Sequence, residues 1–462
     1  MKVYNTLSKK YEELSPVVPK ELKIYVCGPT VYNLIHIGNA RPLCVFDVVR
    51  RFLQYSGYAV TYISNFTDVD DKIINKANAE GVSASEISEK YIAEFYKDSD
   101  GLGVKRADIY PKVTENMSDI VSFIKKLIDK GYAYESGGDV YFSALKFEGY
   151  GKLSHMPIDE LVAGARIDVN DKKREPLDFA LWKAAKPGEP SWESPWGNGR
   201  PGWHIECSVM SEKYAGRTLD IHGGGQDLCF PHHENEIAQS EAATGRPLAN
   251  LWVHNGFINV DNAKMAKSAG NFFTVRDVAE KYGYEPIRLF QIQSAYRSPI
   301  NYTPELLESC KASLERLYNC KENLENAVKS AAAGELSQNT KETVDARKQQ
   351  FILDMSDDFN TANALSAVFE LVTDINRLVA AGGTKADFEY ALKIFGELTD
   401  VLGLLYNETK SEIPEEVIKL SEERTAAKKA KDFALADEIR GRIEALGYRV
   451  EDTRQGVKIV KQ

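Results

Sequence analysis

The sequence predicts an α/β protein in which a parallel sheet is followed by a bundle of helices. Three observations carry this prediction: a strand–helix–strand order near the start, a second strand and helix after residue 200, and helical spacing almost without strand signals beyond about 303. At 462 residues the chain is too long for one hydrophobic core. We therefore expect several domains.

The first half of the expected sheet begins with the apolar run 22–26, which ends at Cys27-Gly28-Pro29. A polar stretch then leads into a helix over about 40–55, and the β-branched and aromatic run 59–64 follows a Gly turn. A strand–helix–strand unit of this kind implies parallel strands joined by a right-handed crossover.

The second half repeats the pattern. We expect a strand over 218–222 that ends in Gly223-Gly224-Gly225, followed by an amphipathic helix from about His232 to Ala243. Between the halves, the segment of roughly 115–200 is rich in turn-forming residues and does not repeat the strand–helix pattern on either side. This difference indicates a domain inserted into the sheet domain.

The last third of the chain predicts helices. Apolar side chains recur at helical spacing at Leu306, Leu307, Cys310, Leu314 and Leu317, and 331–334 and 382–383 are typical of breaks between helices. Pro414 is placed to open a small final unit.

Composition argues against several classes of protein. Residues are 43% hydrophobic and 27% charged, and no apolar run reaches the roughly 18 residues of a membrane span. The start lacks the apolar core of a secretory signal, so we expect a cytoplasmic protein with reduced cysteines. Six scattered cysteines do not suggest disulfides, and a net charge of −10 gives no global sign of nucleic-acid binding.

A phosphate site is predicted before the first helix. The loop from Cys27 to Arg41 contains two glycines and His36, and a helix N-terminus offers unpaired N–H groups and partial positive charge to an anion. His36 would add a donor to developing charge. The alternative is a histidine that only caps the helix.

A second segment, Lys264-Met265-Ala266-Lys267-Ser268, places two lysines three apart among small residues. Two ammonium groups so spaced can stabilise a polyphosphate leaving group. A solvated surface loop is the alternative for this segment taken alone.

Together the two segments resemble the paired signatures of class I aminoacyl-tRNA synthetases. The sequence departs from that pattern at Asn39, where many members have a second histidine, and at Ala266, where many have serine. Three further segments resemble cysteinyl-tRNA synthetases, and this resemblance extends from about residue 2 to 455. They are Asn65-Phe66-Thr67-Asp68-Val69-Asp70-Asp71-Lys72, Gly199-Arg200-Pro201-Gly202-Trp203-His204-Ile205-Glu206-Cys207-Ser208, and 220–236 with its three glycines and His232-His233-Glu234-Asn235-Glu236.

A metal site has some support from spacing alone. His232 and Glu236 are four residues apart on an expected helix and so project from one face. Cys27 and Cys207 could join them only through the fold, and two thiolates, an imidazole and a carboxylate suit zinc. Buried free cysteines and a helix-surface pair are the alternatives. The resemblance implies that these four residues hold one zinc ion.

The resemblance also implies roles for other positions. His36, Lys264 and Lys267 would be catalytic, and Thr67 and Trp203 would line the amino-acid pocket, although Trp203 could instead be a core aromatic. The positions expected to bind ATP, with Mg²⁺, are Gly38, Asn39, Gly224, Asp227 and Ser268.

The end of the chain is basic. From Arg424 to Gln462 there are ten basic and six acidic residues, a balance of +4 in a chain of −10. A solvated helix of mixed charge is the alternative to a phosphate-binding face. This segment resembles the anticodon-reading unit of the family, except that 456–460 lacks the tryptophan often found there.

The resemblance therefore implies an enzyme that activates L-cysteine with ATP and transfers it to tRNA(Cys), working as a monomer. Two alternatives are a ligase that joins cysteine to an amino sugar, which lacks a full anticodon-binding end, and a tRNA-binding paralogue without activation chemistry. The implied fold is a Rossmann-like catalytic domain with an insertion, then a helical bundle and a small anticodon-binding domain. The expected segments are 1–114 and 200–252 for the two catalytic halves, 115–199 for the insertion, 253–309 for a stem-contact region, 310–405 for the bundle and 406–462 for the anticodon-binding domain.

Overall fold

The computed structural model describes residues 1–157, 160, 172–260, 263–264, 272–407, 414–453 and 456–461. The chain forms two compact units, Met1–Leu405 and Tyr406–Gln462, and each is described here by itself. Lys267 and Ser268, which the sequence predicts to act on ATP, lie outside the described residues, as does Ala266.

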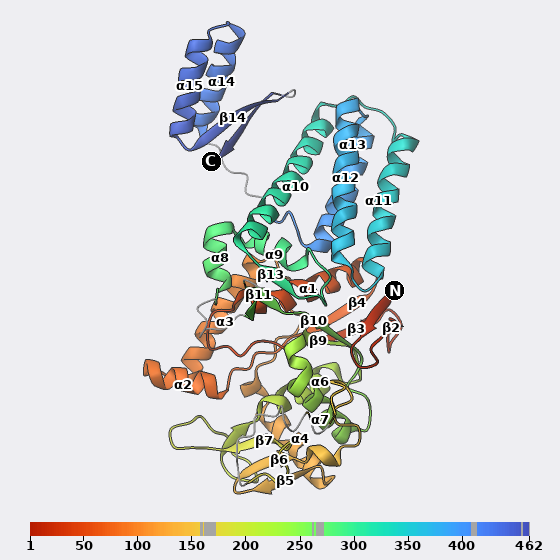
Figure 1. The fold of residues 1–462 in the computed structure, drawn as a ribbon, viewed down its shortest axis with the longest axis vertical. Helices are drawn as coiled ribbons and strands as arrows, with labels where there is room; N and C mark the ends of the chain where they lie inside the picture. Colours follow the sequence, from red (N-terminus) through yellow and green to blue (C-terminus); the bar gives the residue numbers. More distant parts are fainter. Residues whose placement is uncertain are drawn as a thin grey trace. The chain divides into compact units, whose positions relative to one another are not determined.

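A four-stranded parallel sheet lies at the centre of the first unit (Figure 1). Its order is β10 (Ala249–Asn255), β9 (Leu219–Gly225), β3 (Glu21–Val26) and β4 (Ala59–Ile63), and all three pairings are parallel. The predicted parallel sheet is confirmed. The carboxyl ends of all four strands consequently meet at one edge, where ligands of such sheets bind.

The strand expected over 218–222 is longer in the structure. The glycines at 223–225, in which it was expected to end, are the last three residues of β9 and continue its pairing with β10. A Cβ atom at Gly223 would overlap the ring of Phe46, which lies beneath the sheet. These glycines therefore let a helix pack closely against the end of the strand rather than turn the chain.

Helices follow each of the two inner strands. After β3 comes α1 (Ile37–Tyr55), which begins three residues before the predicted start, and after β9 comes α7 (Glu234–Thr244). The second helix was expected from His232, but the residues before it form two short turns, η3 (Gln226–Leu228) and η4 (Cys229–His233). The remaining elements around the sheet are β1 (Lys2–Asn5), β2 (Lys10–Glu13), α2 (Asp71–Glu80), α3 (Ala84–Gly101) and α6 (Trp203–Ala215).

The stretch between the two halves of the sheet forms its own sheet. Strands β5 (Ala133–Ser136), β6 (Asp139–Phe142), β7 (Phe179–Ala184) and β8 (Gly199–Pro201) pair antiparallel in that order. The elements α4 (Met117–Asp129), η1 (Val113–Asn116) and η2 (Ala144–Lys146) accompany it. Since β8 runs directly into α6, this sheet adjoins the helix that carries Cys207.

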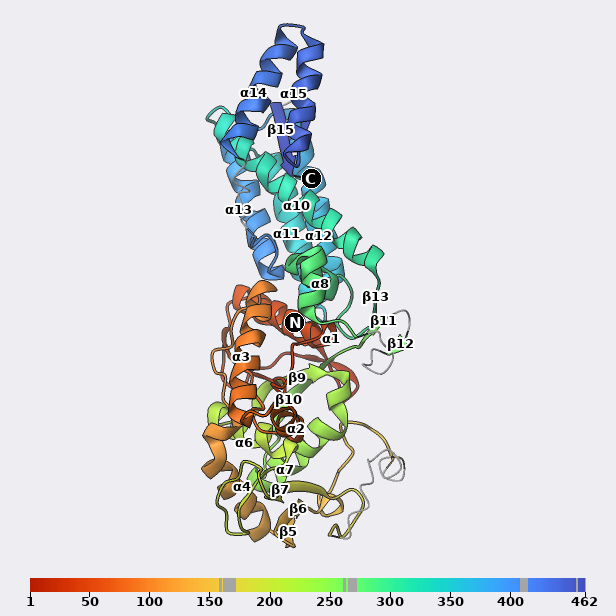
Figure 2. The same ribbon diagram turned by 90° about the vertical axis from the view of Figure 1, so that its left-hand side faces the viewer.

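Beyond the sheet the chain becomes helical, as predicted (Figures 1 and 2). The long helices are α10 (Pro304–Ser330), α11 (Gln338–Ser356), α12 (Thr361–Ala381) and α13 (Lys385–Leu402), so both expected breaks are confirmed. Before them come β11 (Ile258–Val260), β12 (Ala263–Lys264), α8 (Val275–Tyr282), α9 (Tyr284–Ile292) and β13 (Ile300–Tyr302). None of the described helices is long and apolar enough to span a membrane.

Alternation along β3 divides the core of the first unit. Leu22, Ile24 and Val26 belong to the apolar cluster that continues through α1 into the bundle, whereas Tyr25 belongs to a second cluster shared with α6, α7 and the inserted sheet. Because successive side chains of a strand point to opposite faces, the sheet separates these two cores. The predicted ligand Cys27 follows at the end of this strand.

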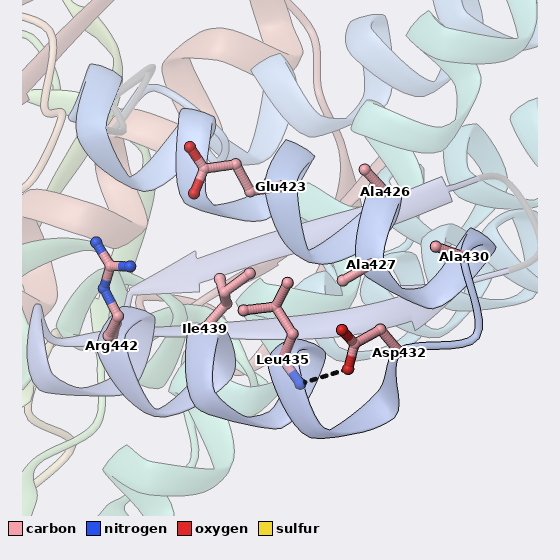
Figure 3. A pocket seen from close by; sticks show the side chains of 8 residues that line it. All are labelled: Glu423, Ala426, Ala427, Ala430, Asp432, Leu435, Ile439 and Arg442. Carbon is pink, nitrogen blue, oxygen red and sulfur yellow. Dashed lines mark hydrogen bonds between the residues drawn. The ribbon is translucent and has the colours of Figure 1, made fainter.

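The second unit is a helical hairpin followed by a β-hairpin. It contains α14 (Glu415–Lys429), α15 (Phe433–Ala445), β14 (Tyr448–Thr453) and β15 (Gly456–Lys461), and Pro414 stands just before α14 as expected. Val417, Leu420 and Ile443 lie in its own small apolar core. A cleft of about 450 Å³ lies between the two helices, with alanines of α14 facing Leu435 and Ile439 (Figure 3).

Candidate metal centre and phosphate site

The structure brings the four predicted metal ligands together. Cys27 follows β3, Cys207 lies on α6, and His232 and Glu236 lie on η4 and α7. One donor atom from each of the four lies within 4.8 Å of all the others. The side chains of Cys207, His232 and Glu236 are buried, with at most 2% of each residue exposed.

Distances between the donor atoms suit a single ion. The sulfurs of Cys27 and Cys207 lie 3.6 Å apart, Cys27 Sγ lies 3.3 Å from Glu236 Oε1, and His232 Nε2 lies 3.0 Å from the same oxygen. Tetrahedral zinc with bonds of about 2.3 Å to sulfur and about 2.0 to 2.1 Å to nitrogen or oxygen separates such donors by roughly 3.3 to 3.8 Å. The residues therefore fit zinc in number, chemistry and spacing.

The charges of this cluster depend on one another. Burial raises the pKa of Glu236, but His222 and His232 outweigh it and hold that pKa well below its usual range. Burial also opposes ionisation of Cys207, yet hydrogen bonds from Cys27 and His232 lower the pKa of Cys207 to about 6. Burial and the neighbouring Cys207 raise the pKa of Cys27 well above its ordinary value. The cluster thus favours negative charge on two of its four donors before any cation is bound.

A second group of donors overlaps the first. Cys27 and Glu236 also lie within 4.8 Å of His222 and His233. His233 Nε2 lies 3.3 Å from Cys27 Sγ, and His222 Nε2 lies 2.8 Å from Glu236 Oε2. The expectation that His233 is a neighbour of the metal rather than a ligand stays a prediction.

Two further histidines, His204 and His254, contact the rings of His232 and His233. His204 Nδ1 lies 2.9 Å from His232 Nδ1, which leaves Nε2 of His232 toward the donor cluster. His254 Nε2 lies 2.8 Å from His233 Nδ1, and its other nitrogen lies 2.8 Å from the hydroxyl of Thr6. Partners of this kind fix the ring orientation of metal-bound histidines. Burial lowers the pKa of His204 well below its usual range and that of His254 to about 3, so both rings are neutral near pH 7.

Trp203 and Thr67 border the donor cluster. Trp203 is not a core aromatic, since 42% of the residue is exposed and its ring centroid lies 4.3 Å from that of His232. Thr67 is buried, and its hydroxyl donates a 2.7 Å hydrogen bond to Glu206. Trp203 is therefore accessible beside the cluster, whereas the Thr67 hydroxyl is enclosed by Glu206 and Asn65.

The helix start beside the cluster is capped by His36. Its Nδ1 accepts the backbone N–H of Asn39, and the Asn39 side chain accepts the N–H of His36. The alternative of a capping histidine is thus observed, and it also fixes the tautomer: a neutral ring that accepts at Nδ1 carries its proton on Nε2. Capping and donation to a ligand therefore do not compete. Gly38 lies between these two residues in the first turn of α1.

Residues 272–275 are bonded to this helix start. Ile37 N–H donates to Phe273, Val275 N–H donates to Ile35, and the ring of Phe272 stacks edge-on against His36 at 5.3 Å. Lys264 lies in β12, paired with Asn259 of β11, and its side chain lies outside the described part.

The two remaining expected ATP positions lie at the end of β9. Gly224 is buried in the strand beside His254 of β10, and Asp227 is exposed in η3 just beyond it. Both are at the same carboxyl edge of the sheet as Cys27.

Sequence reasoning missed several members of the site. His222 lies in the middle of β9, His254 near the end of β10 and Asn65 just after β4, so they are far apart along the chain. Asn65 accepts hydrogen bonds from Gly28 N–H and the Cys207 thiol. The available signal was composition: of the seven histidines in the chain, all except His36 and His155 gather here. Cys229, which was not expected to be a ligand, contacts the carbonyl of Leu153.

Comparison with known proteins finds related sequences over nearly the whole chain. The family model described as tRNA synthetases class I (C) catalytic domain matches residues 13–312, and that of the DALR domain matches residues 350–406. The chain is 54% identical to the cysteine–tRNA ligase of Caldicellulosiruptor saccharolyticus over 462 residues and to that of Clostridioides difficile over 461, covering 99% of each chain in both cases.

Solved structures show the same fold at low identity. Methionyl-tRNA synthetase of Mycobacterium tuberculosis with methionyl-adenylate is 16% identical, with a TM-score of 0.64 over 83% of this chain and 90% of that one. LeuRS of Agrobacterium radiobacter K84 in a ternary complex is 10% identical, with a TM-score of 0.62 over 85% of each chain.

Proposed function

Because this chain belongs to the cysteine–tRNA ligase family of class I aminoacyl-tRNA synthetases, we propose that it selects cysteine through a zinc ion held by Cys27, Cys207, His232 and Glu236. The enzyme activates L-cysteine with ATP and transfers it to tRNA. The single observation that carries the proposal is the convergence of those four donors within 4.8 Å.

In this proposal the zinc ion serves to distinguish cysteine from serine. Serine is nearly isosteric with cysteine, and an apolar pocket separates such near-isosteres by only about 1 to 3 kcal/mol. Zinc binds thiolate sulfur well, so an ion here would supply discrimination that shape cannot. The site therefore serves to recognise the substrate rather than to activate a water molecule.

The phosphate chemistry lies beside the selection site. We assign Nε2 of His36 and the N-terminus of α1, with Gly38 and Asn39, to the phosphates of ATP, together with Lys264, Lys267 and Ser268. In this scheme the carboxylate of cysteine attacks the α-phosphate, and pyrophosphate leaves with Mg²⁺. Fixed donors at a helix start stabilise the developing charge without reorganising, so no protein nucleophile is required.

The remaining assignments concern the two substrates. Thr67 and Trp203 are assigned to the amino-acid side. The contact of Trp203 with His232, and the position of Asn65 between Thr67 and Cys207, support this role. Gly224 and Asp227, at the end of β9, are assigned to adenosine. The basic second unit, residues 406–462, is assigned to the anticodon of tRNA(Cys), and we propose a monomer that works in the cytoplasm.

The metal assignment is tested by Cys207→Ala. We expect the variant to lose stoichiometric zinc and to lose preference for cysteine over serine in ATP–pyrophosphate exchange, because one of two sulfur ligands is gone. Zinc is measured by atomic emission and selectivity by the ratio of kcat/KM for the two amino acids. Cys310→Ala is a matched control, since Cys310 is equally buried but lies on α10.

A variant that keeps both zinc and selectivity would contradict the assignment. His233→Gln separates the two overlapping groups of donors. It should keep zinc if Cys207 and His232 are ligands, and it should lose zinc if His222 and His233 are.

A further inference from the structure

Arg41 is a buried cation without a carboxylate partner among the residues that the structure describes. None of the residue is exposed, and it lies in α1, two residues after Asn39. Burial lowers the pKa of Arg41 to about 10, so the guanidinium group stays charged at pH 7. A buried charge is costly, and an apolar side chain of similar size would avoid that cost. The contacts of the guanidinium group must therefore offset it.

The guanidinium group of Arg41 binds backbone carbonyls. Its Nη1 donates a 2.9 Å hydrogen bond to Phe257, the residue before β11. Its Nη2 lies within 3.3 Å of three carbonyl oxygens in the loop between α9 and β13, those of Ala295, Tyr296 and Ser298. Arginine suits this arrangement because its planar group presents five donors in fixed directions. One side chain of α1 thus binds two other segments of the chain.

The two segments also bond to each other at this point. Gly256 N–H donates to the carbonyl of Tyr296, and Ile300 N–H donates to that of Phe257. A Cβ atom at Gly256 would come within 2.6 Å of the carbonyl oxygen of Arg297, so the two backbones are in direct contact. The beginning of β11 is therefore fixed by backbone contacts, and the guanidinium group binds the carbonyls beside them.

Strand β11 leads from this point to the strand that contains Lys264. It pairs parallel with β13 and antiparallel with β12, where Asn259 lies opposite Lys264. Asn259 follows Phe257 by only two residues, so the carbonyl that Arg41 binds is close to the part of β11 that pairs with Lys264. Helix α1 and strand β11 lie side by side (Figures 1 and 2). A displacement of β11 relative to α1 would consequently move the backbone of Lys264.

The first turns of α1 are bonded to the chain both before and after residues 265–271. Before them, Arg41 donates to Phe257, and after them, the N–H of Ile37 donates to Phe273. The two α1 residues are four apart, which is about one turn of a helix. The same turn contains the N–H groups that the proposed function assigns to the phosphates of ATP.

We propose that Arg41 is a positioning residue that holds β11, and through it the backbone of Lys264, against the phosphate-binding start of α1. The inference rests on the proposed function, which assigns this helix start and Lys264 to the phosphates of ATP. Hydrogen bonds from a charged donor are stronger than those between neutral groups, which suits them to fix this distance. A misplacement of about 1 Å can lower a rate by about a hundredfold, so loss of Arg41 should be measurable.

The test is a double-mutant cycle in ATP–pyrophosphate exchange, with rates expressed per bound zinc. We expect Arg41→Met to lower kcat about tenfold or more. The KM for cysteine should change less than about twofold and zinc should be retained, because none of the described hydrogen bonds of Arg41 is to a metal ligand. Lys264→Ala should lower kcat by itself. In the double variant the loss should stay within about threefold of that in Lys264→Ala, since Arg41 acts through Lys264, whereas independent losses would multiply.

The matched control is Arg50→Met. Arg50 is a buried arginine of the same helix that donates to the backbone carbonyl of Arg106 and pairs with Asp108. Its variant should be less stable than wild type but should keep kcat within about twofold, which separates positioning from loss of stability. If Arg41→Met does not fold, Arg41→Lys keeps the charge but cannot reach all four carbonyls. The same cycle with that variant should show a smaller loss that again does not multiply.

Losses that multiply in the cycle would overturn the proposal, and so would an unchanged kcat in Arg41→Met. In both cases an impaired Lys264→Ala would leave the proposed function standing. Full exchange activity in Lys264→Ala would instead contradict the assignment of Lys264 to ATP, and the role of Arg41 would fall with it.

Discussion

Gly28 shows how closely the backbone approaches itself beside the metal ligands. Its N–H donates a 2.9 Å hydrogen bond to the side chain of Asn65, and a Cβ atom at this position would overlap the Asn65 carbonyl oxygen. Because that oxygen belongs to the backbone, it cannot rotate away. Asn65 in turn accepts a hydrogen bond from the Cys207 thiol, so a displacement of Asn65 would also move this predicted metal ligand.

We therefore predict that Gly28→Ala lowers the free energy of unfolding by about 2 kcal/mol or more and reduces zinc content. Gly396→Ala is the matched control, since Gly396 lies within α13 with no heavy atom within 4 Å of its would-be Cβ, and it should be neutral or slightly stabilising. Urea unfolding and zinc analysis check both variants. Equal stability of the two proteins would contradict the close approach.

Single residues of the site also show which assignments the sequence alone could and could not predict. The pair His232 and Glu236 could be found from spacing, although His232 lies in η4 rather than on the expected helix. Cys27 and Cys207 are 180 residues apart, and nothing local joins them. The resemblance to a family selected them, whereas Arg41 and His254 escaped because their roles depend on contacts between distant strands and helices.

At the scale of elements, Asp387 joins two helices of the bundle. Its carboxylate accepts from the backbone and hydroxyl of Thr384, the cap of α13, and from the backbone and hydroxyl of Ser337, the cap of α11. Burial opposes ionisation, but these hydrogen bonds outweigh it and lower the pKa of Asp387 to about 2. The ionised form is therefore part of the folded bundle.

A lowered pKa in the folded state means that the contribution of Asp387 is present above the unfolded pKa of about 4 and is lost as the pH falls toward about 2. We predict that Asp387→Asn lowers the free energy of unfolding by about 1 to 2 kcal/mol at pH 7, and that this difference shrinks steadily below pH of about 4. Urea titrations of both proteins across this range measure it. A difference independent of pH would exclude the ionised cap.

Elements were predictable where apolar residues kept a single spacing, helical or extended, along the segment. Five apolar side chains at helical spacing identified α10. Leu307, Cys310, Leu314 and Leu317 are buried in the core, whereas Leu306 is 38% exposed. The end of β9 was less predictable: the strand continues through Gly223, Gly224 and Gly225, and the neighbouring ring of Phe46 leaves no room for a side chain at Gly223. Packing between elements, which sequence patterns do not contain, decided that case.

At the scale of the molecule, Arg288 ties the sheet domain to the bundle. From α9 it donates to the carbonyls of Leu402, at the end of α13, and Leu102, after α3, and it pairs with Asp47 of α1 at 2.6 Å. Burial raises the pKa of Asp47, but Arg288 and Arg51 outweigh it and hold that pKa below its ordinary value. The hydrogen bonds and the ion pair of Arg288 therefore connect the sheet domain to the bundle. Both belong to the same apolar cluster.

The second unit has its own core, which suggests that the two activities can be separated. We predict that a chain ending at Leu405 keeps cysteine-dependent ATP–pyrophosphate exchange, while kcat/KM for charging tRNA falls about tenfold or more because basic contacts to phosphate are lost. Exchange and charging assays on the truncated and full chains measure this. Undiminished charging would contradict the assignment of residues 406–462 to tRNA.

The central claim is that a zinc ion recognises the thiol of the substrate. X-ray absorption at the zinc edge tests it most directly, because it counts sulfur ligands. We predict two sulfurs in the enzyme alone, from Cys27 and Cys207, and three when cysteine is added, with no change when serine is added. A count that stays at two with cysteine, or that begins at one, would contradict the account.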